Sequence, residues 1–308
     1  MKKENKIFVA GHKGMVGSAI IRTLINAGFI NIITKTRHEL DLTDQKEVRE
    51  FFQLEKPHYV FLAAAKVGGI LANQDQKADF IRDNLSIQMN VIDSAYAVNV
   101  RKLVFLGSSC IYPRDSLQPI KEEYLLTGPL ETSNDAYAIA KIAGIKMCQA
   151  YQEQFNFNNI CLMPTNLYGP NDNFDLVSSH VFAALLRKFH EAKINNSSSV
   201  VCWGDGSPLR EFLHVDDLAA SCLHFMKLDE NPGLVNIGTG IDITIKDFAE
   251  TISSIVGYKG EIHWDISKPN GTPRKLLSVK KAQGYGWHHS INLCQGIKST
   301  YKWFLENL

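Results

Sequence analysis

The stretch Lys6-Ile-Phe-Val-Ala-Gly11-His-Lys-Gly14-Met-Val-Gly17-Ser-Ala-Ile-Ile-Arg-Thr-Leu24 decides the fold that we expect for this chain. It predicts a buried strand, a glycine turn and the start of a helix. The three glycines let the backbone turn tightly, approach a pyrophosphate and pack the helix closely on its strand. The helix N-terminus then offers free N–H groups and a positive dipole end to an anion. Glycine-spaced turns are common, so an ordinary strand–helix turn is the alternative.

Composition narrows the class of protein. The 308 residues contain 33 Lys and Arg against 32 Asp and Glu, a balance that favours neither nucleic acid nor an anionic membrane as a partner. Only four apolar residues precede Gly11, and no apolar run reaches 18 residues, so we expect a cytoplasmic protein without a signal peptide or membrane span. The cysteines lack C-x-x-C spacing, which favours reduced thiols over disulfides or zinc ligands. They are residues 110, 148, 161, 202, 222 and 294.

The second predicted strand, residues 29–34, is followed by Lys35-Thr-Arg37-His-Glu-Leu-Asp41-Leu42. In dinucleotide folds an acidic residue at the end of this strand accepts the 2′-hydroxyl of the adenosine ribose, whereas a basic residue suits a 2′-phosphate. Arg37 occupies this position, which favours NADP over NAD. The alternative is a solvated basic loop. Asp41 could reach the adenine edge or cap the helix that starts near residue 43.

Strand and helix patterns alternate through the first 170 residues, which predicts an α/β fold with a doubly wound, Rossmann-type parallel sheet. Small and polar residues follow the strands, where open α/β sheets place their ligands. The further strands are predicted at 59–62, 102–106 and 159–163, and the helices at 44–54, 78–98 and 134–155. The strand ends carry Ala63 to Gly69, Leu106-Gly107-Ser108-Ser109-Cys110 and Pro164-Thr165-Asn166-Leu167.

Tyr137 and Lys141 lie four residues apart on the helix predicted at 134–155. This spacing places them on one helix face, where the ammonium can lower the pKa of the phenol from about 10. A phenol needs such a cation before it acts as an acid–base group at neutral pH. A solvated helix face is the alternative, and the preceding Gly-Ser-Ser-Cys strand end favours the catalytic interpretation.

The pattern changes after Gly169-Pro170, so we expect one domain at 1–170, with returning segments near 212–240, and a smaller mixed α/β domain at 171–308. The sequence of the second region predicts a helix with His180 near its start, strands at 200–203, 234–237 and 261–264, and a loop at 268–275. Helices are predicted around 216–227 and 244–256, with a closing helix that ends near 304.

Several strings together resemble the extended short-chain dehydrogenase/reductase superfamily and, within it, the GDP-L-fucose synthases. The resemblance spans essentially the whole chain. The strings are Ala10-Gly-His-Lys-Gly-Met-Val-Gly-Ser-Ala, Leu62-Ala-Ala-Ala-Lys-Val-Gly-Gly-Ile, Leu106-Gly-Ser-Ser-Cys-Ile-Tyr-Pro, Tyr137-Ala-Ile-Ala-Lys-Ile-Ala-Gly, Met163-Pro-Thr-Asn-Leu-Tyr-Gly-Pro, Arg210-Glu-Phe-Leu-His-Val-Asp-Asp and Gly271-Thr-Pro-Arg-Lys-Leu-Leu.

The resemblance implies two steps on a GDP-linked 4-keto-6-deoxy-D-mannose: epimerisation at C3 and C5, then reduction of C4 by NADPH. A 4-ketone acidifies the hydrogens on its neighbouring carbons, so inversion needs a base, an acid and donors to the enolate oxygen. The resemblance makes Cys110 the base, His180 the acid, and Ser108 and Tyr137 the donors, with Tyr137 and Lys141 serving the reduction. The alternatives are a small buried hydrophobe for Cys110 and a core or capping residue for His180.

The resemblance also implies which residues bind the cofactor and the sugar nucleotide, and that the protein is a homodimer formed through helices such as 78–98 and 134–155. Asn270, Ser278 and Lys188 stand where the family has aspartate, aspartate and arginine, and the lysine lacks the bidentate fork of arginine. The implied cofactor residues are Gly11, His12, Lys13, Gly14, Met15, Val16, Gly17, Arg37, Asp41, Leu42, Leu106, Gly107, Ser108, Ser109, Lys141, Pro164, Thr165, Asn166, Leu167 and His180; the implied GDP-sugar residues are Lys188, Trp203, Arg210 and Asn270.

Two other functions fit parts of the pattern. An NAD-dependent sugar-nucleotide 4-epimerase does not need the Cys110/His180 pair. A 4,6-dehydratase needs Asp or Glu beside Ser or Thr near the tyrosine helix, and Glu131-Thr132 matches this pattern only by loose analogy. A non-catalytic nucleotide-binding sensor is the third possibility. Such proteins usually lack the tyrosine or the lysine, whereas this chain has both.

Overall fold

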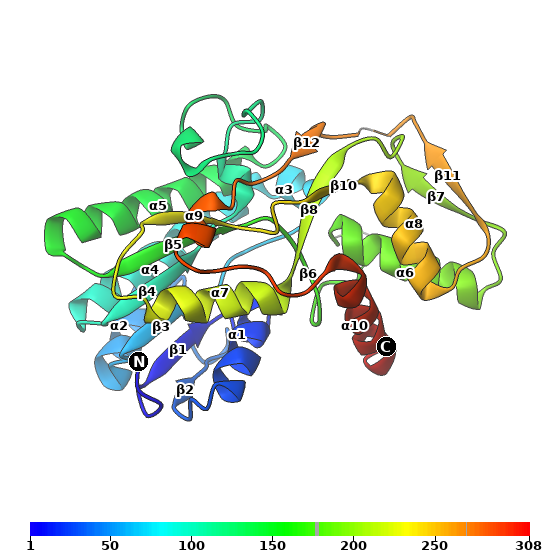
Figure 1. Ribbon diagram of the computed structural model, residues 1–308. Helices are drawn as coiled ribbons and strands as arrows, with labels where there is room; N and C mark the ends of the chain where they lie inside the picture. The colour runs from blue at the N-terminus through cyan, green and yellow to red at the C-terminus, as the bar shows by residue number, and fades with distance from the viewer. Residues whose placement is uncertain (176–178, 269) are drawn as a thin grey trace.

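A parallel sheet forms the centre of the first lobe in the computed structural model, which describes residues 1–175, 179–268 and 270–308 (Figure 1). Within these ranges the sheet has six strands in the order β2-β1-β3-β4-β5-β9. The order reverses between β1 and β3, which creates the switch point where such sheets bind ligands. The predicted doubly wound parallel sheet is confirmed. The strands are β1 (Ile7–Ala10), β2 (Ile32–Ile33), β3 (Tyr59–Leu62), β4 (Lys102–Leu106), β5 (Asn159–Pro164) and β9 (Leu234–Ile237).

Helices cover both faces of this sheet because successive strand residues point to opposite sides. Phe8 on β1 packs with the helices of one face, whereas Ile7 and Val9 pack with those of the other. The first face carries α2 (Gln45–Glu55), α4 (Lys77–Ala97) and α5 (Asp135–Phe155), and the second carries α1 (Met15–Asn26) and α7 (Val215–Lys227). Two short helices, α3 (Ile70–Asp75) and α9 (Lys280–Gly284), complete the first lobe.

The glycine turn forms as predicted. Gly11 has a φ of +84°, and a Cβ atom there would lie 2.7 Å from the backbone nitrogen of Ala64 after β3. A Cβ atom on Gly17 would lie 2.1 Å from the carbonyl oxygen of Gly11. Glycine at both positions therefore lets the ends of β1, β3 and α1 meet.

The second lobe combines short strands with three helices. Its core includes Phe212 and Phe248, whose stacked ring centroids lie 3.8 Å apart. The strands are β6 (Asn166–Tyr168), β7 (Ser199–Trp203), β8 (Leu209–His214), β10 (Asp242–Thr244), β11 (Glu261–Asp265) and β12 (Arg274–Lys275), and the helices are α6 (Val181–Ile194), α8 (Ile245–Val256) and α10 (Leu293–Glu306). The sequence patterns missed β6, β8, β10 and β12. Residues 274–275 were expected in a loop but form a strand.

The chain crosses between the lobes at five points, from β5 to β6, β8 to α7, β9 to β10, β12 to α9 and α9 to α10 (Figure 1). At three of these crossings, those of β6, β10 and β12, the second-lobe strand pairs with β8. After β12 the chain returns to the first lobe, where Leu277 and Ala282 are buried in its two cores. In the described part of the chain, no helix is long and apolar enough to span a membrane.

Candidate active site

Cys110 lies in the turn that follows β4, and its side chain is only 6% exposed. Burial raises the pKa of its thiol, whereas the positive charge of Lys275, a hydrogen bond with Ser108 and the charge of Lys141 oppose this rise. Ser108 Oγ also accepts a hydrogen bond from the backbone N–H of Cys110, at 3.4 Å. The thiol is therefore buried among cations and a hydroxyl, rather than in a purely apolar core.

Lys141 points from α5 toward the end of β4. Its Nζ donates a hydrogen bond to the carbonyl oxygen of Leu106 at 2.8 Å and lies 5.8 Å from the centre of the Tyr137 ring. Burial lowers the pKa of Lys141 to about 8. The pKa of Tyr137 is raised, by burial and by the charge on Cys110. The expected lowering of the phenol pKa by Lys141 is therefore wrong here, because burial dominates and a carbonyl oxygen holds the ammonium.

Four of the predicted catalytic side chains thus share one neighbourhood: Ser108, Cys110, Tyr137 and Lys141. His180 lies at the N-cap of α6 and is exposed, although neighbouring atoms lower its pKa by desolvation. Within the described ranges, no hydrogen bond or electrostatic contact joins His180 to the other four. Its proposed role rests on its position at the start of α6, beside the cavity-lining Val181.

The turn at residues 11–17 fits a pyrophosphate. Helix α1 begins after Gly14. The N–H groups of its first turn have no intrahelical partner, and Gly14 has no side chain to cap them. Arg37, with 74% of its side chain exposed, lies 3.8 Å from Asp41. Asp41 accepts hydrogen bonds from the backbone N–H and the hydroxyl of Thr43, which lower its pKa, and Asp44 rather than Asp41 caps α2.

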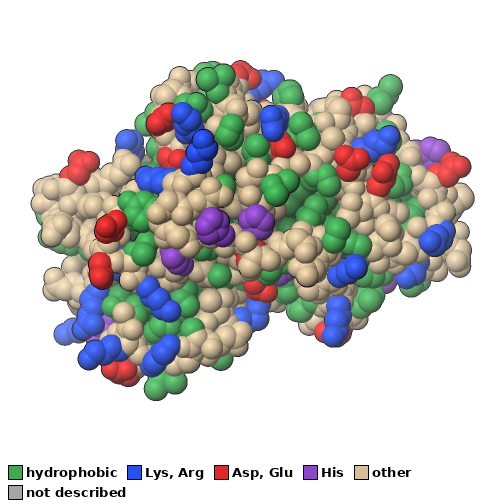
Figure 2. Space-filling model, in the orientation of Figure 1, with side chains coloured by type: hydrophobic (Ala, Val, Ile, Leu, Met, Phe, Trp, Pro, Cys, Tyr) green, Lys and Arg blue, Asp and Glu red, His purple; other side chains and the backbone are tan. Residues whose placement is uncertain are grey.

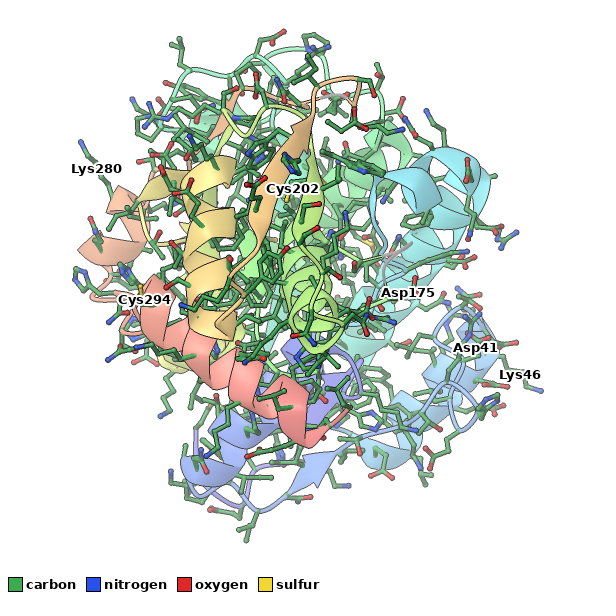
Figure 3. The ribbon with its side chains drawn as sticks, turned by 90° about the vertical axis from the view of Figure 1, so that its right-hand side faces the viewer. Asp41, Lys46, Asp175, Cys202, Lys280 and Cys294 are labelled. Atoms are coloured by element: carbon green, nitrogen blue, oxygen red, sulfur yellow. The ribbon has the colours of Figure 1, made fainter. Side chains whose placement is uncertain are left out.

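The other predicted cofactor residues lie at or next to strand ends of the first lobe. They are His12, Lys13, Met15 and Val16 after β1; Leu42 after β2; Leu106, Gly107 and Ser109 at β4; and Pro164, Thr165, Asn166 and Leu167 where β5 continues into β6. Figure 3 looks onto the second lobe and shows Cys202 of β7 in the upper middle, with Asp41 on the right-hand side of the molecule. The predicted adenosine end and the second-lobe strands are therefore well separated.

A cavity of about 190 Å³ lies in the second lobe. Three of the four predicted substrate residues line it, namely Trp203, Arg210 and Asn270, together with Asn166. In Figure 2 hydrophobic side chains gather in the hollow between the lobes, over β8 and β10. The full lining is Asn166, Val181, Trp203, Gly206, Pro208, Arg210, Ile245 and Asn270.

Trp203, with 58% of its surface exposed, has two lysines near its ring. Lys188 Nζ lies 6.0 Å from its ring centre and donates to the carbonyl oxygen of Val201 at 3.3 Å. Lys268 Nζ lies 5.6 Å from the same ring. Sequence reasoning missed Lys268, and the lysine-rich loop in which it lies offered the only signal.

Arg210 and Lys275 are opposite each other on the paired strands β8 and β12. Burial lowers the pKa of both side chains, and neither forms a salt bridge with a carboxylate in the described part of the chain. Two adjacent, half-buried cations that form no salt bridge among the described residues attract an anion. Lys275 was missed because residues 268–275 carry the composition of a loop.

The two aspartate positions that differ from the family pattern are both engaged. Asn270 Oδ1 accepts from the backbone N–H of Asp205 at 2.9 Å, at the rim of the cavity. Ser278 is buried, and its backbone N–H donates to the carbonyl oxygen of Ile120 at 2.7 Å. A larger cavity, of about 530 Å³, lies between α6 and α10 and contains none of the predicted site residues.

Known proteins match this chain over its full length. The model of the NAD dependent epimerase/dehydratase family matches residues 7–238. "Putative GDP-L-fucose synthase 2" of Arabidopsis thaliana is 58% identical over 100% of this chain and 94% of its own length. "GDP-L-fucose synthase" of Escherichia coli (strain K12) is 52% identical over 99% of this chain and 98% of its own length.

A solved structure shares the fold closely. The GDP-mannoheptose C4 reductase MlghC of Campylobacter jejuni, with NADP bound, has a TM-score of 0.91 and 43% identity, and the match covers 99% of both chains. The chain therefore belongs to the NAD dependent epimerase/dehydratase family, within which it groups with proteins named GDP-L-fucose synthase.

Proposed function

We propose that the protein converts GDP-4-keto-6-deoxy-D-mannose into GDP-L-fucose with NADPH, by 3,5-epimerisation followed by reduction of C4. The names of relatives at 52–58% identity support this proposal. The observation that carries it is the buried Cys110 thiol among Ser108, Tyr137 and Lys141. A plain reductase needs the phenol and the ammonium, but it has no need for a thiol there.

The cofactor would bind across the ends of the first-lobe strands. A Cβ atom at Gly11 or Gly17 would collide with neighbouring backbone, so glycine keeps the turn at residues 11–17 tight, and the N-terminus of α1 that follows suits a pyrophosphate. Arg37 and Lys35 suit a 2′-phosphate, and a relative at 43% identity was solved with NADP bound. When bound, the nicotinamide supplies a hydride. Lys141, fixed by the Leu106 carbonyl, would bind the nicotinamide ribose.

In the epimerisation, Cys110 as thiolate removes a proton from the carbon beside the ketone, and His180 gives a proton to the opposite face of that carbon. The Cys110 thiol then loses its proton to solvent and His180 takes one up from solvent, after which the same exchange at the second carbon inverts that centre. Ser108 and Tyr137 hold the developing negative charge on the C4 oxygen, which such donors stabilise. The charge of Lys275 favours the thiolate that this step requires.

In the reduction, a hydride adds to C4 and the Tyr137 hydroxyl gives its proton to the C4 oxygen, so that the ketone becomes an alcohol. The Lys141 ammonium, 5.8 Å from the ring centre, then stabilises the phenolate that remains. Arg210 and Lys188 would bind the diphosphate, while Trp203 offers an aromatic face and Asn270 an amide to the rest of the GDP-sugar.

The test is incubation with GDP-4-keto-6-deoxy-D-mannose and NADPH in deuterated water. We expect loss of NADPH absorbance and a product that carries deuterium at C3 and C5. A second candidate, C4 reduction without epimerisation, is suggested by the C4 reductase among the solved relatives. It gives loss of NADPH absorbance with no label at either carbon. If neither loss of NADPH absorbance nor label is found, the non-catalytic nucleotide-binding sensor is the interpretation that remains.

The division of labour between the lobes, the assembly and the cellular location are also part of this proposal. Residues 1–170, with the returning segments near 212–240, would bind NADP, and residues 171–308 would bind the GDP-sugar. A homodimer through α4 and α5 is supported by the half-exposed Met89 and Ile139 on these helices. All six cysteines are free and five are buried, which suits a reducing cytoplasm.

A further inference from the structure

Glu211 lies on β8 with no exposed surface. Its carboxylate accepts hydrogen bonds from the backbone N–H groups of Thr239 at 2.6 Å, Gly240 at 2.7 Å and Leu277 at 2.9 Å. A Cβ atom on Gly238 would lie 2.2 Å from Glu211 Oε1, so glycine lets the chain after β9 close onto the carboxylate. Glu211 therefore binds two segments that are distant from it in sequence.

The backbone of Glu211 binds a third segment. Its carbonyl oxygen accepts from Thr165 Oγ1 at 3.2 Å and from Asn166 Nδ2 at 2.9 Å. These residues lie where the chain leaves β5 for β6, whereas residues 239–240 lie between β9 and β10, and Leu277 follows β12. One residue thus contacts three of the five crossings between the lobes.

Among the described residues Glu211 forms no salt bridge, and Arg210 and Lys275, which flank it on β8 and β12, do not pair with it. Three backbone N–H groups, with the Thr239 hydroxyl at 3.4 Å, satisfy the buried charge. A buried acid that serves only packing is readily replaced by an apolar side chain, whereas this one is placed to fix three backbones.

The fixed segments carry both sides of the candidate active site. Arg210 and Asn166 line the cavity of the second lobe. Lys275 lies two residues before Leu277 and is the strongest positive influence on the Cys110 thiol. A shift at any of the three crossings would move these groups relative to Cys110.

We propose that Glu211 is a positioning residue that holds the three crossings together and so sets the distance of Arg210 and Lys275 from Cys110 and Tyr137. This role rests on the proposed function, because the reaction needs both groups on one substrate. Misplacing a substrate-positioning group by about 1 Å lowers the rate of an enzyme roughly 100-fold.

The test compares Glu211→Gln with Asp217→Asn in the full chain. The glutamine amide must turn its N–H₂ group toward at least one backbone N–H that the carboxylate accepts. Asp217 is a matched control, because it is also buried and accepts from the N–H and hydroxyl of Ser290 and the N–H of Ile291. It lies in the first turn of α7, and its partners lie between α9 and α10, outside the three crossings that Glu211 contacts.

We expect Glu211→Gln to speed amide hydrogen exchange at 239, 240 or 277, to raise the KM for the GDP-sugar, and to lower kcat/KM by about 100-fold. Asp217→Asn should speed exchange at 290–291 and leave KM near the wild-type value. Faster exchange in Glu211→Gln with unchanged kinetics, or unchanged exchange, would overturn the proposal. If the wild-type protein does not turn over the GDP-sugar, the proposed function fails, and the exchange comparison then decides whether Glu211 fixes the crossings.

Discussion

At the scale of single residues, the Tyr137 hydroxyl has the most demanding chemistry in the proposed reaction. Its pKa is raised by burial, which suits a proton donor better than a base. Tyr137→Phe keeps the ring that packs edge-on against Phe80, with centroids 6.3 Å apart, and removes only the proton donor. We expect the rate of NADPH oxidation to fall by about 10²- to 10⁴-fold, measured by absorbance under saturating substrate.

A matched control is Tyr112→Phe, because Tyr112 is also buried but donates its hydroxyl to Asn236 Oδ1 at 2.6 Å, in a network with Ile120 and Ser278. That change should lower the free energy of unfolding by about 1–3 kcal/mol, because Asn236 loses its donor. It should leave kcat close to wild type. Equal kinetic losses in both variants would assign Tyr137 a structural role only.

Arg37 is expected to select the cofactor. It is exposed, and its only short ion pair in the described ranges is the 3.8 Å contact with Asp41, so its guanidinium can turn to a 2′-phosphate. Arg37→Ala should raise the KM for NADPH about tenfold or more, the value of one charge-assisted hydrogen bond, and leave the KM for NADH unchanged.

Lys46→Ala is the control for Arg37→Ala. Lys46 is an exposed lysine at the start of α2, and Figure 3 shows it beside Asp41. Steady-state assays with both cofactors make the comparison. A parallel change in both KM values for Arg37→Ala would show that the guanidinium does not read the 2′ position.

At the scale of elements, the turn between β1 and α1 has no room for a side chain. Gly17→Ala would place a Cβ atom 2.1 Å from the Gly11 carbonyl oxygen, which is backbone and cannot rotate away. We expect the free energy of unfolding to fall by about 1–3 kcal/mol through overpacking, and NADPH affinity to fall at least about tenfold as the N–H groups of α1 shift. Urea unfolding and NADPH fluorescence titration measure the two effects.

Gly284→Ala provides the comparison, because nothing lies within 4 Å of a Cβ atom there. Both properties should stay near wild type in that variant. If Gly17→Ala binds NADPH as tightly as Gly284→Ala does, residues 11–17 are not the pyrophosphate cradle.

The elements also show where sequence patterns succeed. Strands β1, β3, β4 and β5 are buried on both faces and read as short apolar runs, so they were predicted almost to the residue. Strand β8 contains Arg210 and Glu211, and it is held by pairing with β6, β10 and β12 from distant parts of the chain. No local periodicity signals such a strand, which explains why β8 and its partners were missed.

The same contrast applies to the site. Tyr137, Lys141, Ser108 and Cys110 come from two adjoining elements with recognisable motifs, and sequence reasoning brought them together. Lys275 lies on β12, a strand of two residues that is too short to give a sequence pattern. A buried acid such as Glu211 also has no signature in a single sequence. The pKa of Tyr137 also escaped prediction, because i, i+4 spacing indicates proximity but not burial.

At the scale of the whole molecule, buried lysines make stability depend on pH. Burial lowers the pKa of Lys102 and of Lys141 to about 8, against about 10.4 in an unfolded chain. Below pH 8 both states hold these protons. Between about pH 8 and 10 the unfolded chain binds more protons, so the free energy of unfolding rises with pH, by up to about 1.4 kcal/mol per pH unit for each lysine.

Lys102→Met isolates one of these contributions, because Lys102 donates to the Leu228 carbonyl oxygen at 2.6 Å, outside the candidate active site. Urea unfolding at several pH values should show a shallower rise than in wild type. Lys280→Met, which changes an exposed lysine at the start of α9, should keep the wild-type slope (Figure 3). Equal slopes in all three proteins would mean that Lys102 titrates normally in the folded state.

The two-step reaction requires that the Cys110 thiol acts on the carbons beside the ketone that Tyr137 protonates. The most direct measurement is the deuterium content at C3 and C5 after reaction in deuterated water, for wild type and Cys110→Ser. We predict label at both carbons in wild type and a loss of about 10²-fold or more in the rate of labelling in Cys110→Ser. Wild-type rates of labelling in Cys110→Ser would contradict the account.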